Sequence, residues 1–230
     1  GDEPGAVMEL YSFAKAMGTN VEVMGKGKNN KLDYDCNPDT VLEEATRRVM
    51  SPKMLCAFKD GTKTMVEMTA MSNYTGLVPD VIGGHGPQTS PGTEGIKELN
   101  DILKLKKDGG ILNKHGVVEY VNGVAPGVFV TVSTPNEEIA YQMAYHSMGP
   151  GPLWTLYRPY HLCNLETPLT VAKAVIDGEV TCVPIDGLVS ECITRAKIDL
   201  KAGQTIDGIG GFTTHGSIAE AKESDAKGYV

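Results

Sequence analysis

The sequence predicts an α/β (α+β) fold, in which a mixed sheet carries helices mainly on one face and a small all-β unit follows. Amphipathic helical segments alternate with short strands through the first 150 residues, which is typical of a sheet covered by helices. Two adjacent strands, 116–121 and 127–133, are separated by a turn-rich stretch. From residue 185 onward, short strand candidates alternate with dense turns, which indicates a small β-rich unit.

The first helix has clear boundaries. Apolar residues recur at helical spacing over 4–17, Pro4 suits the first helical turn, and Gly18 suits the position after the last one. The following segment, 21–24, alternates like a short strand. We expect it to end in a polar, solvent-facing loop over 25–31, because this loop is rich in glycine, lysine and asparagine.

Further helix and strand signals follow in order. Asn37-Pro38-Asp39-Thr40 is typical of a helix start, and the methionines of 61–74 share one helical face. The glycine- and proline-rich stretch 79–95 predicts a functional loop, because it is longer than a plain connection. The remaining pattern predicts helices at 39–50, 61–74, 96–105, 135–147 and 164–176, strands at 53–58 and 191–196, and an aromatic segment at 153–162.

Composition and charge exclude several classes of function. The net charge is −8, which argues against a nucleic-acid-binding protein, since that needs clustered lysine and arginine. No run reaches 18 apolar residues, so we expect no membrane partner. The five cysteines are an odd, scattered set without a Cys-x-x-Cys pair, which is typical of reduced thiols in a cytoplasmic protein.

Two pairs of charged residues near the start of the chain are candidate site residues. Asp2 and Glu3 lie at a helix start, where they either complement the helix dipole or line a ligand site. Lys26 and Lys28 flank a glycine directly after a strand. They either form a solvated basic turn or polarise a carbonyl oxygen or bind a phosphate, and Asn29 continues the same loop.

Two further clusters carry groups suited to proton transfer and anion binding. His85 stands between glycines in the long loop, and is either a substrate contact or a turn residue without a role. Tyr157, Arg158 and His161 lie in a dense aromatic cluster that either packs a joint or orients an anionic group. Gly208-Ile209-Gly210-Gly211 lacks the spacing of a dinucleotide-binding loop, and no Cys/His cluster indicates zinc.

These motifs together resemble a known family. Gly1-Asp2-Glu3-Pro4-Gly5, Gly25-Lys26-Gly27-Lys28-Asn29 and Asp60-Gly61-Thr62-Lys63 resemble the catalytic domain of homoserine-dehydrogenase-like oxidoreductases, and within these the 1-deoxy-D-xylulose 5-phosphate reductoisomerase-like proteins. The segments 149–161 and 166–168 fit the same group. The tail, with Asp199-Leu200-Lys201-Ala202-Gly203 and Asp207-Gly208-Ile209-Gly210-Gly211, resembles a SAF domain of the β-clip type.

The resemblance implies a domain organisation and a chemistry. Residues 1–150 would form the catalytic, substrate-binding and dimerisation domain, 151–184 a connecting aromatic segment and helix, and 185–230 a SAF-like domain. A Rossmann domain that binds NAD or NADP would precede Gly1, so we expect this chain alone to bind no cofactor tightly and to be inactive. We expect a homo-oligomer that acts on a small polar carbonyl or alcohol, including phosphorylated ones.

The resemblance also implies roles for the candidate residues. Lys26 or Lys28 would stabilise developing oxyanion charge, and His85 or His161 would carry a proton. The remaining candidates, which would bind substrate, are Asp2, Glu3, Asn29, Tyr157 and Arg158. Whether the site also uses a divalent metal held by carboxylates stays an open question. The sequence also leaves open the alternative that the chain is a non-enzymatic carbohydrate- or metabolite-binding protein.

Overall fold

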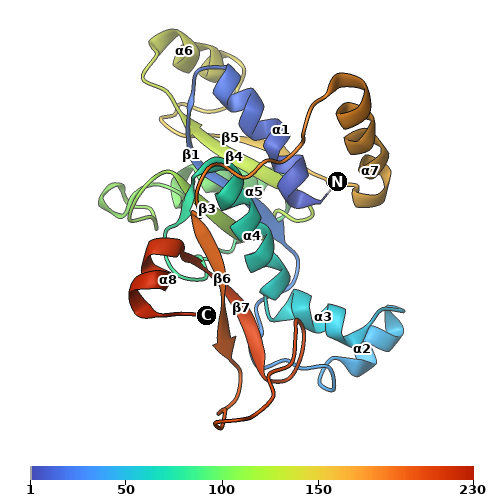
Figure 1. The fold of residues 1–230 in the computed structure, drawn as a ribbon. Coiled ribbons are helices and arrows are strands. Elements are labelled where there is room, and N and C mark those ends of the chain that lie inside the picture. The colour runs from blue at the N-terminus through green and yellow to red at the C-terminus, as the bar shows by residue number, and fades with distance from the viewer. Residues whose placement is uncertain (1) are drawn as a thin grey trace.

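A five-stranded mixed sheet forms the centre of the computed structural model, which describes residues 2–230 (Figure 1). The strand order is β2-β3-β1-β4-β5, with β1, β2 and β3 parallel, β4 antiparallel to β1, and β5 antiparallel to β4. The strands of this sheet are β1 (Asn20–Lys28), β2 (Val78–Pro79), β3 (Val117–Asn122), β4 (Val128–Ser133) and β5 (Trp154–Arg158). The predicted α/β class with a mixed sheet is confirmed.

Helices cover both faces of this sheet. α1 and α4 cover one face and enclose a core that contains Met24, Val130 and Trp154 of the sheet. α5 packs on the other face, against Val23 and Phe129. The helices of the chain are α1 (Glu3–Ala16), α2 (Leu42–Arg47), α3 (Pro52–Lys59), α4 (Thr62–Thr75), α5 (Gly92–Ile102), α6 (Glu137–Tyr145), α7 (Cys163–Ala172) and α8 (Ala221–Lys227), with short helical turns η1 (Lys106–Asp108) and η2 (Lys173–Asp177).

The loop predicted over 25–31 is wrong in its first part, because strand β1 continues to Lys28. Successive side chains alternate between the two faces, so Lys26 and Lys28 point to the side of Met24, under α1 and α4. Gly25 occupies the opposite face, where a Cβ atom would lie 2.2 Å from the Glu119 carbonyl oxygen. Gly27 is equally confined, 2.3 Å from Ala125 N. Both lysines are about 5% exposed or less, so the expectation that they face solvent was wrong.

One strand prediction and one helix prediction also need correction. Residues 53–58, predicted as a strand, lie in helix α3, where Pro52 occupies the first turn and Leu55, Cys56 and Ala57 are buried. The run of apolar residues is too short to separate a strand from a helix by periodicity. The helix predicted at 39–50 is shorter in the structure, where α2 covers only the middle of that range, Leu42–Arg47.

The C-terminal segment is an antiparallel pair, β6 (Ser190–Ala196) and β7 (Thr214–Glu220), which packs along α4 (Figure 1). Asn73 Nδ2 donates to the Ser190 carbonyl at 2.9 Å, and Gly216 N donates to Thr62 Oγ1 at 2.9 Å. The segment ends in α8, so it does not consist of strands alone. Its identity as a SAF domain stays a prediction, as do the domain boundaries at 150 and 184. Within residues 2–230, no helix is long and apolar enough to cross a membrane.

Candidate active site

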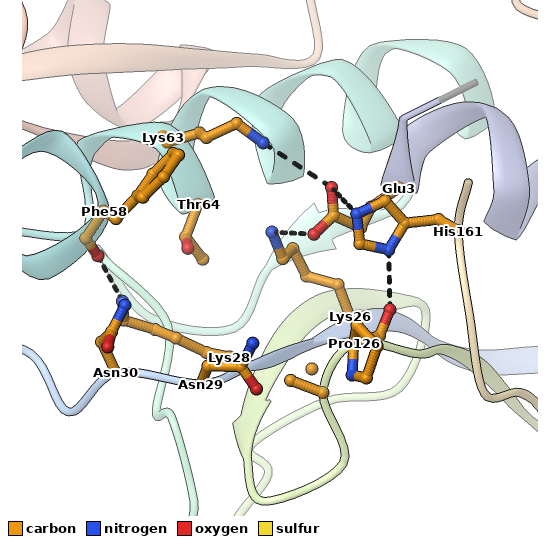
Figure 2. A pocket seen from close by; sticks show the side chains of 12 residues that line it. Glu3, Lys26, Lys28, Asn29, Asn30, Phe58, Lys63, Thr64, Pro126 and His161 are labelled. Carbon is orange, nitrogen blue, oxygen red and sulfur yellow. Dashed lines mark hydrogen bonds and ion pairs between the residues drawn. The ribbon is translucent and has the colours of Figure 1, made fainter. Parts of the chain in front are cut away.

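A pocket of about 220 Å³ opens where β1 ends, beneath the start of α1 (Figure 2). Its walls come from the start of α1, the end of β1 and the asparagines after it, the corner between α3 and α4, the β3–β4 loop, and the segment after β5. The residues that line it are Glu3, Lys26, Gly27, Lys28, Asn29, Asn30, Phe58, Lys63, Thr64, Ala125, Pro126 and His161.

An ion-pair network crosses this pocket from β1 to α1 and α4. Lys26 Nζ lies 2.8 Å from Glu3 Oε1 and donates a short hydrogen bond to Glu67. Lys63, one turn before Glu67 on α4, pairs with Glu67 and reaches Asp2 at 3.2 Å. Lys26, Glu3 and Glu67 are each about 6% exposed or less, so their charges are shielded from water.

In this network three carboxyl groups, those of Asp2, Glu3 and Glu67, meet only two ammonium groups. The excess of negative charge contributes to a raised pKa at Glu3. Burial, aided by the hydrogen bond with Asp2 and the nearby Glu67 charge, raises the pKa of Glu3 to about 8. Burial acts on Asp2 in the same direction, but its bonds to Glu3 and the charge of Lys63 outweigh it and hold the pKa of Asp2 far below its ordinary value. Glu3 Oε2 is buried and accepts no hydrogen bond. Glu3 is therefore the carboxyl that keeps a proton at neutral pH.

Lys28 differs from its neighbour Lys26. Its ammonium donates to the carbonyl oxygen of Phe58 at 2.5 Å, and within residues 2–230 it has no carboxylate partner. Burial, followed by repulsion from Lys26, lowers the pKa of Lys28 from 10.5 to about 8. The side chain is thus a buried cation that lines the pocket with unused donor capacity.

His161 closes the pocket on the side of the β3–β4 loop (Figure 2). Its Nδ1 lies 2.7 Å from the carbonyl oxygen of Pro126, which can only accept, so we assign the Nδ1 proton to this bond. Nε2 then faces Glu3 Oε2 at 3.4 Å and Asp2 Oδ1 at 3.8 Å. The imidazole is therefore oriented by its backbone bond toward the protonated carboxyl.

The structure brings together six of the nine residues singled out from the sequence. Lys26, Lys28, Glu3, Asn29 and His161 line the pocket, and Asp2 lies at its edge through the contact with Lys63 described above.

The other three candidates lie elsewhere and make different contacts. His85 Nε2 lies 2.6 Å from Asp80 Oδ2. Tyr157, on the α5 side of the sheet, donates its hydroxyl to the Val124 carbonyl at 2.8 Å. Arg158 is held by Glu9 and Glu166.

Two charged residues of the pocket network were missed by the sequence reasoning. Lys63 and Glu67 are four residues apart on α4, the spacing of a helical ion pair. Glu67 also interrupts the buried methionine face, since Met68 and Met71 beside it are fully buried. A carboxylate in that position was the available signal that α4 faces a charged partner. Phe58 and Thr64 were also missed, and no sequence pattern indicated them.

The pocket carboxylates do not form a ready metal site. Oxygen atoms of Asp2, Glu3 and Glu67 lie within 4.8 Å of one another, and those of Asp2 also approach His161 and Cys163. The ammonium groups of Lys26 and Lys63 already contact these three carboxylates, so a divalent cation would have to displace them. The donor set therefore fits a proton and two ammonium groups better than a metal ion.

A comparison with protein families identifies the greater part of the chain. The family model described as "oxidoreductase DRL, catalytic domain" matches residues 1–167, which include every residue of the pocket. Residues 168–230, including β6, β7 and α8, lie outside the match. No curated protein matches this chain. The match covers well over half of the sequence, and the chain therefore belongs to the family of oxidoreductase DRL catalytic domains.

Proposed function

We propose that this oxidoreductase domain binds a small polar substrate with a carbonyl or alcohol group at Lys28 and interconverts the two with NAD or NADP. In this chemistry it would be similar to the homoserine-dehydrogenase-like and reductoisomerase-like enzymes. The observation that carries the proposal is the buried Lys28 ammonium, which lines a pocket without a carboxylate partner among residues 2–230. A buried cation of this kind favours a ligand that brings an oxyanion or an anionic group.

In the reducing direction, NAD or NADP in its reduced form would supply the hydride, and the part of the reaction that falls to this chain lies at the carbonyl oxygen of the substrate. The Lys28 ammonium would donate a hydrogen bond to that oxygen as its negative charge develops. Its pKa of about 8 also lets it release a proton to the alkoxide near neutral pH. The product is an alcohol, with one hydride and one proton added.

The Glu3–His161 pair would return a proton to Lys28 after reduction, and in the oxidising direction it would accept the proton that Lys28 takes from the alcohol. Glu3 keeps a proton to a pKa of about 8, and His161 Nε2 lies 3.4 Å from its free oxygen. The Lys26 ammonium contacts both Glu3 and Glu67. We therefore give Lys26 a structural role, in which it positions Glu3 next to His161, rather than a contact with the substrate.

The residues described here do not fit a dinucleotide site. None of the turns in residues 2–230 has the Gly-x-Gly-x-x-Gly spacing between a strand and a helix that receives a pyrophosphate. We therefore assign the cofactor to a separate domain of the protein and derive only the substrate side of the reaction from this chain.

Replacement of Lys28 by methionine in the full-length protein tests the proposal. We expect kcat/KM to fall about a hundredfold or more, the scale for the loss of one oxyanion donor. In the wild-type enzyme, kcat/KM for reduction should fall as the pH rises through about 8, because the protonated lysine is the active form. Lys222→Met at an exposed site is the matched control.

The outcomes separate catalysis from stability. Lys28→Met removes a buried charge without leaving an unpaired carboxylate, so the variant should fold and melt at least as high as the wild type. A folded Lys28→Met variant whose kcat/KM stays within threefold of the wild type would show that this lysine does not stabilise the reacting oxygen.

A further inference from the structure

Lys197, in the connection between β6 and β7, turns away from solvent and joins three separate segments. Its side chain is 2% exposed, and its Nζ lies 2.7 Å from Asp60 Oδ2. The same ammonium donates to the carbonyl oxygens of Cys36 at 2.8 Å and Gly211 at 3.0 Å. All three donor positions of the ammonium are thus used, each on a different part of the chain.

The first of these segments is the α3–α4 corner, residues 58–63, which forms one wall of the pocket. Asp60 is fully buried, and its two carboxylate oxygens have different partners. Oδ2 faces Lys197, and Oδ1 accepts a hydrogen bond from the backbone N–H of Thr62, the first residue of α4, at 2.9 Å. The corner begins with Phe58, whose carbonyl receives the Lys28 ammonium, and ends with Lys63 of the ion-pair network. The position of Asp60 therefore sets the position of both pocket groups.

The second segment is the chain that follows β1. Asn29 and Asn30 line the pocket, and a few residues later the Cys36 carbonyl is bound by Lys197. Between them, Asp33 N donates to the Lys59 carbonyl of the corner at 2.9 Å. Lys197 and this backbone bond thus fix the asparagine wall against the α3–α4 corner.

We propose that Lys197 is a positioning residue of the active site. It holds the α3–α4 corner and the segment after β1 together, in the positions that keep the Lys28 ammonium buried against the Phe58 carbonyl. The inference rests on the function proposed above for Lys28. Lys197 does not line the pocket, and it lies outside residues 1–167, the range matched by the oxidoreductase family. The C-terminal segment therefore supplies part of the support of a site whose reacting groups all precede it.

Loss of the Lys197 ammonium has a specific consequence for Lys28. The corner would no longer be tied to Cys36 and Gly211, so the Phe58 carbonyl would move and water would reach Lys28. Because burial is the main cause of its lowered value, the pKa of Lys28 would rise from about 8 toward 10.5. A displacement of about 1 Å in a reacting group lowers a rate by as much as a hundredfold.

Two variants of the full-length protein separate positioning from stability. Lys197→Met leaves the buried Asp60 carboxylate without a cation, so it should lower the melting temperature. Lys197→Met/Asp60→Asn removes both charges and keeps an oxygen that accepts from Thr62 N, so it should recover most of the wild-type melting temperature. In both variants we expect kcat/KM to fall at least tenfold, with Lys222→Met as the exposed control.

A second readout does not depend on activity. The pKa of Lys28 is measured by its pH-dependent acetylation with acetic anhydride, followed by mass spectrometry, and should rise by at least one unit in the double variant. A double variant with wild-type melting temperature, kcat/KM within twofold and an unchanged Lys28 pKa would reduce Lys197 to a stabilising residue. Failure of both variants to fold would also reject the positioning role in favour of a folding role.

Failure of the proposed function gives a different pattern. If Lys28→Met keeps wild-type activity, the catalytic assignment falls, while the acetylation measurement still decides whether Lys197 sets the environment of Lys28. If Lys28→Met is inactive and the folded double variant is fully active, only the positioning role falls.

Discussion

Replacement of Glu3 by glutamine should remove a pH-dependent loss of stability from the folded chain. Burial raises the pKa of this carboxyl from 4.5 to about 8, so the folded state keeps a proton that the unfolded chain releases near pH 4.5. The stabilisation from this proton is complete below pH 4.5 and is lost as the pH rises through about 8. Glutamine has nearly the same shape and no proton to lose.

The size of the effect follows from the shift. Each unit between folded and unfolded pKa is worth about 1.4 kcal/mol, so the wild type should lose about 3 kcal/mol from this group between pH 4.5 and 7. The pKa of Asp2 is lowered, so its own titration lies below this window. The free energy of unfolding of Glu3→Gln, relative to wild type, should therefore rise by about 3 kcal/mol from pH 4.5 to 7.

Urea denaturation of the 230-residue chain at pH 4.5, 5.5, 7 and 8 measures this difference directly. Glu43→Gln, at an exposed position in the first turn of α2, is the control and should follow the wild type at every pH. Parallel pH profiles for wild type and Glu3→Gln would refute the reasoning, because they would mean that Glu3 ionises as freely in the folded chain as in the unfolded one.

Two further predictions concern strand β1. Lys26→Met removes the ammonium that contacts both the protonated Glu3 and Glu67, and leaves the buried Glu67 carboxylate with Lys63 as its cation, so it should lower the free energy of unfolding at pH 7 by about 1.5–3 kcal/mol. Much of this should return in Lys26→Met/Glu67→Met, and equal stability of the single and double variants would contradict the network. Gly25→Ala places a Cβ atom 2.2 Å from the Glu119 carbonyl oxygen and should lower the free energy of unfolding by about 1–3 kcal/mol. Gly208→Ala, which has open space around it, is the control and should keep the wild-type melting temperature. An unchanged melting temperature in both variants would contradict the close packing of β1.

Much of the sheet could be predicted from the sequence, because valine-rich strands such as β3 and β4 report burial on both faces. Strand β1 could not be predicted beyond Met24, since glycine and lysine are poor strand residues on their own. Lysine is tolerated at Lys26 because Glu67, 41 residues later in the chain, meets it in the folded state. A pairing over such a distance leaves no local pattern.

The same limit explains which site residues could be found. Glycine next to Lys26 and Lys28 was a local signal, and both lysines do line the pocket. His85 carried an equally good local signal, yet its imidazole is bound by Asp80, five residues before it. Tyr157 and Arg158 point to opposite faces of β5, which could have been deduced once that segment was recognised as a strand.

The alternation of glycine and lysine in β1 also makes the sheet sensitive to its own register. A slip of one residue against β3 and β4 would exchange the faces, so two ammonium groups would enter the apolar layer under α5 and two glycines would replace them beneath α1. Such a misaligned chain would bury two unpaired cations and also take the Lys26 ammonium away from Glu3 and Glu67. The residues that build the pocket therefore act during folding as well, since they make a one-residue misalignment of the central strand far less stable than the native alignment.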